Sequence, residues 1–343
     1  MFAYIAILVA LASLWYFETR TSFVSAGIST SSSVWLSTVC MPIMIGVFLW
    51  RYYHQHHGIR KKASHNDPYG LFHLSLNRRS GEDENEPPKT EWLNMGYWKD
   101  TKVFPDACQA LALKLIQTAQ CKEGGKILDV GHGTGESLIM LLTHTSVPRP
   151  GYLSGITSIP MHHQRSLERV KSIVAADTKI TLHVGDAVYH QDVSAANHPL
   201  NPSSAVTFDN ILALDCAYHF QSRETFLRQS FHQLDPGGRI SLADICFANT
   251  PPMTWKARLV RRFLKLMPKE NAITISEYAN CLERIGYVDV KVEDISEEVF
   301  PGFVGFLKPR GLVWWIFGSV LYSYHGAGAR FVIASGYRSK ESK

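Results

Sequence analysis

Residues 127–137 read ILDVGHGTGES, an apolar run that passes into glycines at positions 131, 133 and 135. Glycine weakens a strand or a helix, so three glycines at alternating positions indicate a turn at which another group comes close to the backbone. Dinucleotides, phosphate groups and sulfonium cofactors all bind at strand-to-helix turns of this kind. The stretch therefore predicts a cofactor site, and the surrounding sequence has to distinguish the three.

The dinucleotide and phosphate alternatives each lack part of their sequence pattern. A dinucleotide turn has the spacing G-x-G-x-x-G, whereas the third glycine here comes one residue early. Dinucleotide folds also place an acidic residue at the end of the second strand, but the segment GITSIP (155–160) has Thr157 and Ser158 there. The G-K-[ST] of a phosphate loop is missing too. These departures disfavour an NAD- or FAD-dependent dehydrogenase, which stays as an alternative.

Short apolar strands alternate with amphipathic helices from about Glu91 onward. This alternation is typical of an α/β fold with one doubly wound, mostly parallel sheet. No regular crossover helix separates the last two strands, which favours an antiparallel final strand. We expect seven strands, at 126–130, 152–156, 179–184, 208–214, 239–245, 287–293 and 330–336, and helices at 105–121, 135–144, 160–174, 223–234 and 275–285.

Two uncharged apolar runs, 1–17 and 34–50, precede this region. As a helix each would be about 25 Å long, near the lower limit for a hydrocarbon core of about 30 Å. Basic residues at 51 and 60–62 follow the second run, so the positive-inside rule places the rest of the chain in the cytosol. We expect a transmembrane anchor at 1–50, in the endoplasmic reticulum membrane, although run 1–17 could instead be a cleaved signal peptide. A juxtamembrane linker at 51–90 and a catalytic domain at 91–338 would follow.

The charge and the cysteines exclude two other classes of partner. The chain has a net charge of +5, but residues 1–62 hold five Lys and Arg against one Glu, so the remainder is almost neutral. A near-neutral domain offers no electrostatic footprint for nucleic acid. The six cysteines are scattered without a C-x-x-C pair, so we expect no metal site and no disulfide framework.

Two segments interrupt the alternation of strands and helices. Residues 252–270 form an amphipathic basic pattern, and residues 297–328 include the apolar run GLVWWIFGSVLY, which is too short to cross a membrane. Either segment could be ordinary core packing, a helical lid over a greasy site, or a surface that lies on the bilayer.

The pattern D-x-G-x-G-x-G is accompanied by several further motifs, and together they resemble the class I S-adenosylmethionine-dependent methyltransferases. The similarity is to the small-molecule and lipid group, which includes the rebeccamycin sugar, tocopherol, sterol and phosphoethanolamine methyltransferases. It implies a Rossmann-like fold with S-adenosylmethionine as methyl donor. The matching segments are NMGYW (94–98), GIT (155–157), VGDA (184–187), FDNILALDCAYHF (208–220) and LDPGGRISLADI (234–245).

The resemblance also implies which residues bind the cofactor. Asp129 and the glycines would hold the methionine moiety, and Asp186 would accept a hydrogen bond from the adenine amino group. Two positions depart from the group's pattern, because His132 and His162 stand where a small residue and a glutamine are usual. The full set of expected cofactor residues is Tyr97, Asp129, Gly131, Gly133, Gly135, Thr157, Asp186, Ala187 and Asp215.

Methyl transfer to a hydroxyl group needs a base, and ligands of open α/β sheets bind at the carboxyl ends of the strands. His219 follows the fourth strand and is the expected general base, with Asp244 in the fifth strand orienting or polarising it. The sequence thus predicts a membrane-anchored enzyme that O-methylates a lipophilic small molecule in natural-product biosynthesis. The alternatives are N- or C-methylation of a membrane lipid and a non-catalytic membrane scaffold; protein partners are left open.

Overall fold

The computed structural model describes residues 73–83, 85–173, 177–250, 254–255, 257–258, 260 and 266–340. The chain divides into two compact units, residues 1–65 and 66–343, and all described residues belong to the second. The expected anchor at 1–50, most of the linker and about half of the basic segment at 252–270 lie outside the described residues. Within the described ranges, no helix is both long enough and apolar enough to cross a membrane.

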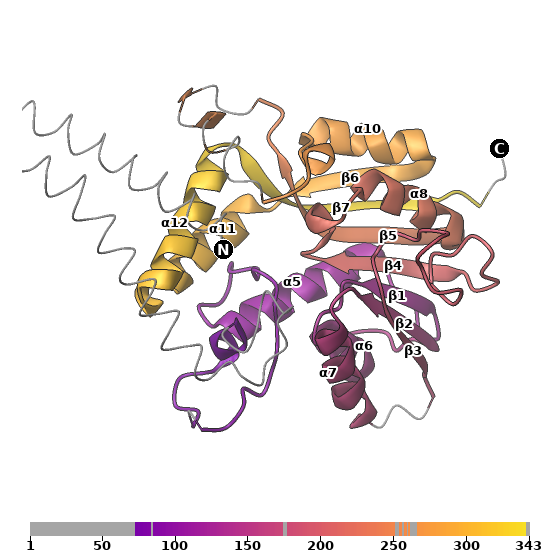
Figure 1. Ribbon diagram of the computed structural model, residues 1–343, viewed down its shortest axis with the longest axis horizontal. Helices are drawn as coiled ribbons and strands as arrows, with labels where there is room; N and C mark the ends of the chain where they lie inside the picture. The colour runs from indigo at the N-terminus through magenta and orange to yellow at the C-terminus, as the bar shows by residue number, and fades with distance from the viewer. Residues whose placement is uncertain are drawn as a thin grey trace, which may run out of the picture. The chain divides into compact units, whose positions relative to one another are not determined.

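A seven-stranded sheet in the order β3-β2-β1-β4-β5-β7-β6 forms the centre of the second unit (Figure 1). The pairs among β1 to β5 are parallel, whereas β7 runs antiparallel to both β5 and β6. The predicted doubly wound, mostly parallel sheet and its antiparallel last strand are therefore confirmed. The strands are β1 (Lys126–Val130), β2 (Tyr152–Thr157), β3 (Lys179–Val184), β4 (Phe208–Leu214), β5 (Leu234–Phe247), β6 (Tyr287–Asp294) and β7 (Ala329–Arg338).

Helices cover both faces of the sheet, as right-handed crossovers require. The strand order reverses between β1 and β4, so α6 and α7 lie on one face and α8 and α10 on the other (Figure 1). This reversal point, at the carboxyl ends of β1 and β4, is where open α/β sheets bind ligands. The helices are α5 (Phe104–Ala119), α6 (Glu136–Thr143), α7 (Pro160–Lys171), α8 (Arg223–Gln233), α10 (Ile275–Ile285), α11 (Ser296–Leu307) and α12 (Leu312–Gly326).

The apolar runs of the central strands explain the sheet, because parallel strands are buried on both faces. Leu128 in β1, Ile211 in β4 and Leu242 in β5 are completely buried. Short 3-10 helices complete the described fold: η3 (Ser75–Asn77), η4 (Ala217–His219), η5 (Lys269–Asn271) and η6 (Lys308–Arg310). Of these, η4 follows β4 directly and therefore lies at the reversal point.

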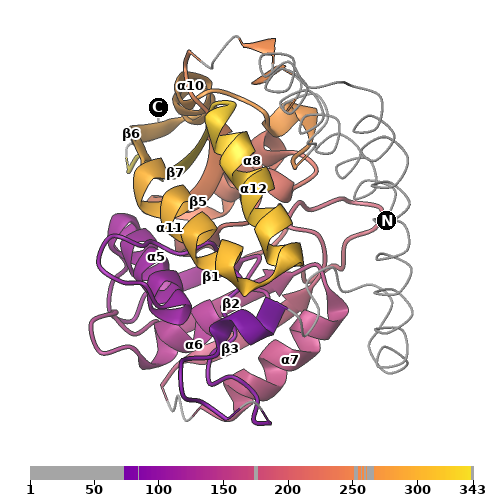
Figure 2. The same cartoon turned by 90° about the vertical axis from the view of Figure 1, so that its left-hand side faces the viewer.

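The segment expected as an insertion at 297–328 forms two helices, α11 and α12. They follow β6 and precede β7 along the chain, and they lie side by side (Figure 2). The inner side of α11 packs against the motif at 94–98 and against α5. The rings of Phe303 and Phe306 lie 6.4 and 5.3 Å from the ring of Trp98, and Phe306 stacks on Phe104 at 5.1 Å. This aromatic cluster fixes the helix pair to the loop that precedes α5.

Candidate functional site

The glycine turn after β1 takes a backbone path that few other residues can follow. Gly131 and Gly135 have φ values of +78° and +92°, in the region that side chains with a Cβ rarely adopt. A Cβ atom on Gly131 would stand 2.6 Å from Sγ of Cys216, and one on Gly135 would stand 2.9 Å from Cβ of Ser166. Gly133 also has a positive φ, of +54°. The three glycines thus allow a tight turn whose outer backbone can be approached closely.

Asp129 lies beneath this turn, one residue before the end of β1. Its carboxylate is 1% exposed and accepts a hydrogen bond from the Ser137 hydroxyl of α6 at 2.5 Å. Burial raises the pKa of Asp129 to about 6, while the bond from Ser137 acts in the opposite direction. The first turn of α6 is therefore bonded to the strand end that carries the glycines.

A partly buried set of ion pairs connects the start of α6 to α7. Arg165 donates two hydrogen bonds to the carboxylate of Glu91, at 2.6 and 2.5 Å, and Arg169 pairs with Glu136. Glu136 also accepts the backbone amide of Glu91 at 2.8 Å. Glu136 stands in the first turn of α6, where a carboxylate is favourable to the helix dipole. These contacts hold the segment before the NMGYW motif against the turn.

The second expected half of the cofactor site lies at the ends of β2 and β3. Thr157 ends β2 and is 5% exposed; its carbonyl accepts the amide of Gly185 at 3.0 Å. Asp186, the next residue, is exposed and accepts the amide of Val188 at 2.8 Å, while Ala187 is buried. The backbone carbonyl of Asp186 also contacts the His198 ring nitrogen at 2.9 Å. The two loops are thus tied together, with the Asp186 side chain at the surface.

Asp215 follows β4 and connects this strand to the NMGYW motif. Its Oδ2 accepts the backbone amide of Met95 at 2.7 Å, but its buried Oδ1 has no hydrogen-bond partner among the described residues. Burial raises the pKa of Asp215 to about 8, and hydrogen bonding with the Met95 amide and the Tyr218 side chain partly offsets this. Its φ of +56° is also unusual for a residue other than glycine. A strained, poorly solvated carboxyl group with an unused acceptor is typical of a ligand site.

Tyr97, expected at the cofactor, has contacts that run to α5 instead. Its amide donates to the carbonyl of Ala107 at 2.8 Å, and its ring lies 5.7 Å from Nζ of Lys114. Met95 supplies the amide that binds Asp215, and a Cβ on Gly133 would meet Leu93 at 3.0 Å. Leu93 and Met95 were missed by sequence reasoning, although their position in and beside the 94–98 motif was a usable signal.

The two histidines that depart from the family pattern both border the glycine turn. His132 is 6% exposed and packs over β2, so that a Cβ on Gly155 would come 2.8 Å from its ring. Burial lowers the pKa of His132 to about 3, so the ring is neutral at neutral pH. Nδ1 of His162 would lie 4.0 Å from a Cβ on Gly133. Both rings thus lie beside the glycine turn, and the His132 ring adds no positive charge there at neutral pH.

His219 is exposed at the end of η4, four residues after Asp215. Its ring lies 4.1 Å from that of Tyr218, and its amide donates to the carbonyl of Cys216 at 3.0 Å. Although part of the residue is exposed, the surrounding protein desolvates the ring and lowers the pKa of His219. The negative charge of Asp244 acts in the opposite direction and raises it. A neutral imidazole near neutral pH can accept a proton, which is the state that a general base requires.

Asp244, expected to orient or polarise His219, acts on it through its charge and forms its hydrogen bonds with other residues. The carboxylate of Asp244 is completely buried and receives Nη1 of Arg223 at 2.5 Å and the hydroxyl of Tyr278 at 2.8 Å. The backbone amide of Ile245 fills a further acceptor position at 2.9 Å. Because these donors occupy both oxygens of the carboxylate, Asp244 influences His219 through its charge.

Asn271, which sequence reasoning missed, holds η4 in place. Its side-chain amide donates to the carbonyls of Tyr218 and Phe220 at 3.2 and 2.7 Å, on either side of His219. Its side-chain oxygen accepts the backbone amide of Arg223 at 2.9 Å. Asn271 is 1% exposed, so all these bonds are shielded from water. No local sequence pattern marks this residue, because its partners lie about 50 positions away.

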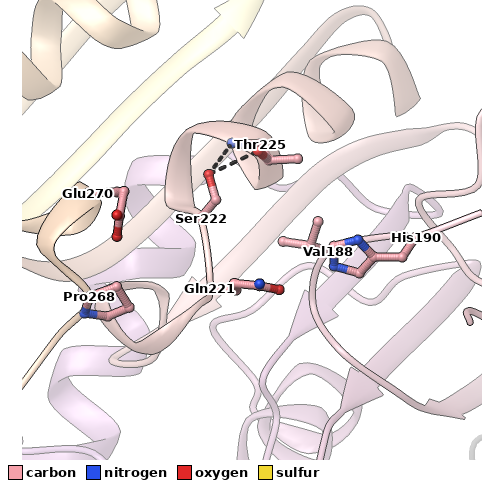
Figure 3. A pocket seen from close by; sticks show the side chains of 7 residues that line it. All are labelled: Val188, His190, Gln221, Ser222, Thr225, Pro268 and Glu270. Atoms are coloured by element: carbon pink, nitrogen blue, oxygen red, sulfur yellow. Dashed lines mark hydrogen bonds between the residues drawn. The ribbon is translucent and has the colours of Figure 1, made fainter.

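A cavity of about 500 Å³ opens beside the start of α8 (Figure 3). One side of it is formed by residues that follow Asp186, and the other by residues that follow His219. Within it, the hydroxyl of Ser222 caps α8 by accepting the amide of Thr225 at 3.2 Å. The cavity therefore connects the surroundings of two expected site residues. Its lining is Val188, His190, Gln221, Ser222, Thr225, Pro268 and Glu270.

The sequence model of the methyltransferase domain family matches residues 97–292, which is more than half of the chain and includes β1 to β5 and most of β6. The chain belongs to this family. The protein is a class I S-adenosylmethionine-dependent methyltransferase of the small-molecule group, and S-adenosylmethionine is its methyl donor. This assignment confirms the resemblance, and it argues against the dehydrogenase and the non-catalytic scaffold.

Relatives of this methyltransferase include two bacterial enzymes. It is 28% identical to the erythromycin 3''-O-methyltransferase of Saccharopolyspora erythraea over 226 residues, which cover 64% of this chain and 69% of the relative. It is 27% identical to the 27-O-demethylrifamycin SV methyltransferase of Amycolatopsis mediterranei, over 62% of this chain and 72% of the relative.

The fold of the methyltransferase is also found among solved structures. A cyclopropane synthase from Mycobacterium tuberculosis superposes with a TM-score of 0.58 over 72% of this chain and 90% of the other, at 11% identity. At this identity the similarity concerns the fold alone, and it agrees with the strand order described above.

Proposed function

We propose that this methyltransferase transfers the methyl group to a hydroxyl group of a lipophilic natural product, with His219 as the general base. The observation that carries the proposal is the placement of an exposed, neutral His219 on η4, at the carboxyl end of β4. The names of the relatives add support, because the erythromycin and rifamycin enzymes act on natural products. N- or C-methylation of a membrane lipid is the second candidate, but no described residue specifically favours it.

The cofactor is best accommodated along the ends of β1, β2 and β4. The glycine turn follows a backbone path with positive φ at Gly131, Gly133 and Gly135, and the amides at the start of α6 suit the carboxylate of the methionine moiety. The unpartnered Oδ1 of Asp215 suits a cationic group of the cofactor. Asp186, at the other end, suits the adenine amino group. Asp129, Gly135, Thr157 and Ala187 complete the proposed site, and Tyr97 remains a predicted contact.

S-adenosylmethionine supplies an electrophilic methyl group, so the acceptor oxygen forms the new bond while the C–S bond breaks and its electron pair stays on sulfur. The proton of the acceptor hydroxyl passes to the neutral imidazole of His219, which later releases it to solvent. Asn271 and the buried Arg223–Asp244 pair hold η4, so the imidazole keeps its position during transfer. Orientation of this kind supplies a large part of the rate.

The proposal is tested by incubating the full chain with methyl-labelled S-adenosylmethionine and a lipophilic extract, and by locating the label by mass spectrometry. Label on an ether oxygen is expected. His219→Ala should lower kcat by roughly 10²–10⁴-fold with little change in cofactor affinity. Because the pKa of His219 is lowered, the acidic limb of the wild-type rate should lie below the ordinary histidine value of about 6.5 and vanish in the variant.

His190→Ala is the matched control, since His190 is a histidine that lines the cavity beside the start of α8 from the loop after Asp186, away from η4. It should keep most of the activity. Label on nitrogen or carbon, or a His219→Ala enzyme with most of its kcat, would refute O-methylation by this mechanism.

We also propose that residues 1–50 anchor the enzyme in the endoplasmic reticulum membrane, with the domain at 91–338 on the cytosolic side. The support is the two uncharged runs and the basic residues after the second. Carbonate washing should leave the full chain in the membrane pellet. Protease added to sealed microsomes should cut the linker at 51–90, and a protected linker would reverse the orientation.

A further inference from the structure

One side of α12 exposes large apolar residues to solvent. Leu312, Trp315 and Tyr322 are 54%, 50% and 64% exposed, and their spacing places them on a single side of the helix. The opposite side is buried, with Trp314 and Leu321 at 6% and 4%. Contiguous exposed apolar surface of this kind marks a contact with another protein or with a membrane.

The charge around this surface favours a membrane. Between Val299 and Lys340 the chain has five Lys and Arg and no Asp or Glu, although Arg330 is paired with Asp294 and Glu297 lies 3.6 Å from the ring of His325 in α12. Two of the basic residues, Lys308 and Arg310, stand in η6 immediately before α12. Nζ of Lys308 lies 5.1 Å from the ring centroid of Tyr322, so a basic group and an interfacial aromatic share the same surface.

These residue types match the headgroup region of an anionic bilayer. Trp and Tyr prefer the boundary between headgroups and acyl chains, and each Lys or Arg close to an anionic surface contributes about 1 kcal/mol. The 15 residues of α12 are too few to span the bilayer. The helix α12 can therefore lie in the plane of the membrane interface, with its exposed side among the lipids.

We propose that the exposed side of α12, with Lys308 and Arg310, docks the methyltransferase domain on an anionic phospholipid surface. This contact does not depend on the identity of the acceptor or on how residues 1–50 are placed. It brings α11, and through it the loop at 94–98, next to the lipid phase.

Hydroxyl-radical footprinting of the full chain, reconstituted in vesicles, tests the proposal. Oxidation of Trp315 and Tyr322 should fall several-fold in vesicles of phosphatidylcholine and phosphatidylserine relative to phosphatidylcholine alone. Tyr152 in β2 should be oxidised equally in both, because β2 is separated from β7 by three strands. Any anchoring by residues 1–50 is common to both vesicles, so the comparison isolates the effect of anionic lipid.

Charge reversal supplies the matched variants. Lys308→Glu with Arg310→Glu should abolish the dependence on phosphatidylserine, whereas Lys89→Glu with Lys291→Glu, at exposed positions elsewhere, should keep it. Thermal stabilisation by S-adenosylmethionine in both variants would show that they fold. Equal oxidation in the two vesicle types would overturn the proposal. Protection that grows with protein concentration without lipid would also overturn it, in favour of a second copy of the chain.

Discussion

At the scale of single residues, Asp215 combines a left-handed backbone with a carboxyl group that has lost most of its solvation. Its raised pKa means that the cofactor-free protein holds a proton there more tightly than an unfolded chain would. Stability contributed by this proton is present at low pH and is lost as the pH rises towards about 8. Ionisation of Asp215 therefore lowers the stability of the fold. We infer that the ionised carboxylate is kept at this position because it binds a cationic group.

Asp215 should therefore couple cofactor binding to proton release. At about pH 7 the carboxyl group is mostly protonated in the free protein, and a cationic group of the cofactor would drive it to ionise. Calorimetry in buffers of different ionisation enthalpy should show that S-adenosylmethionine binding releases a proton. Asp215→Asn should remove this release and weaken binding by about 1.5–3 kcal/mol, the range for a hydrogen bond to a charged group.

The same variant separates function from folding. Asn at position 215 keeps an oxygen for the amide of Met95 but cannot ionise. The cofactor-free Asp215→Asn protein should consequently be at least as stable as the wild type at about pH 8, where the wild-type carboxyl group is half ionised. Unchanged proton release in the variant would remove Asp215 from the cofactor site.

At the scale of elements, η4 is held by contacts that are distant in sequence. Asn271→Ala would remove two donors to the carbonyls beside His219 and the acceptor for the amide of Arg223. Each buried group left unpaired costs about 1–3 kcal/mol, so the variant should be destabilised. Its kcat should also fall at least tenfold because His219 loses its fixed position, while affinity for S-adenosylmethionine should stay near that of the wild type.

Asn280→Ala is the control for this prediction, since Asn280 is exposed on α10 and lies outside η4. It should leave both stability and kcat unchanged. If Asn271→Ala lost stability but kept its kcat at a temperature where it is folded, Asn271 would have a purely structural role.

The elements also show what sequence can and cannot predict. The strand limits were predicted closely, because buried parallel strands are apolar runs between turn residues. Strand β5 was the largest difference: it begins at Leu234, five residues before the expected start, since Leu234 pairs with Phe208 across a bulge. The expected single insertion at 297–328 is broken into α11 and α12 by Gly311, whose φ is +102°.

The candidate site also has a part that the sequence predicts and a part that it does not. The glycines and the carboxylates at 129, 186 and 215 were recognisable because each stands at or just after the carboxyl end of a strand. Asn271 and the Arg223–Asp244 pair were not, because they come together only after β5 and η5 have packed. The hydrogen bond from Arg223 to Asp244 could likewise not be foreseen from spacing in the sequence.

At the scale of the whole molecule, the proposed cofactor site joins strand ends from both halves of the sheet. The glycine turn follows β1, Asp186 follows β3 and Asp215 follows β4, on the two sides of the point where the strand order reverses. A ligand that contacts all three would link the halves. Its binding energy should therefore appear as stability of the entire domain, since only the folded state brings the three loops together.

This linkage can be measured as a thermal shift of the full chain. At a concentration of 100 times its Kd, S-adenosylmethionine should stabilise the fold by about 2.7 kcal/mol, which corresponds to a rise in Tm of roughly 5–10 °C for a domain of this size. NAD should give no shift, because the turn lacks the dinucleotide spacing. Gly131→Ala should abolish the shift, since its Cβ would collide with Cys216 at the turn. Gly124→Ala imposes a similar backbone strain, at a φ of +72°, but meets no atom within 4 Å, so it should lower the starting Tm and retain the shift. A shift with NAD equal to that with S-adenosylmethionine, or its loss in both glycine variants, would contradict a cofactor seated on the glycine turn.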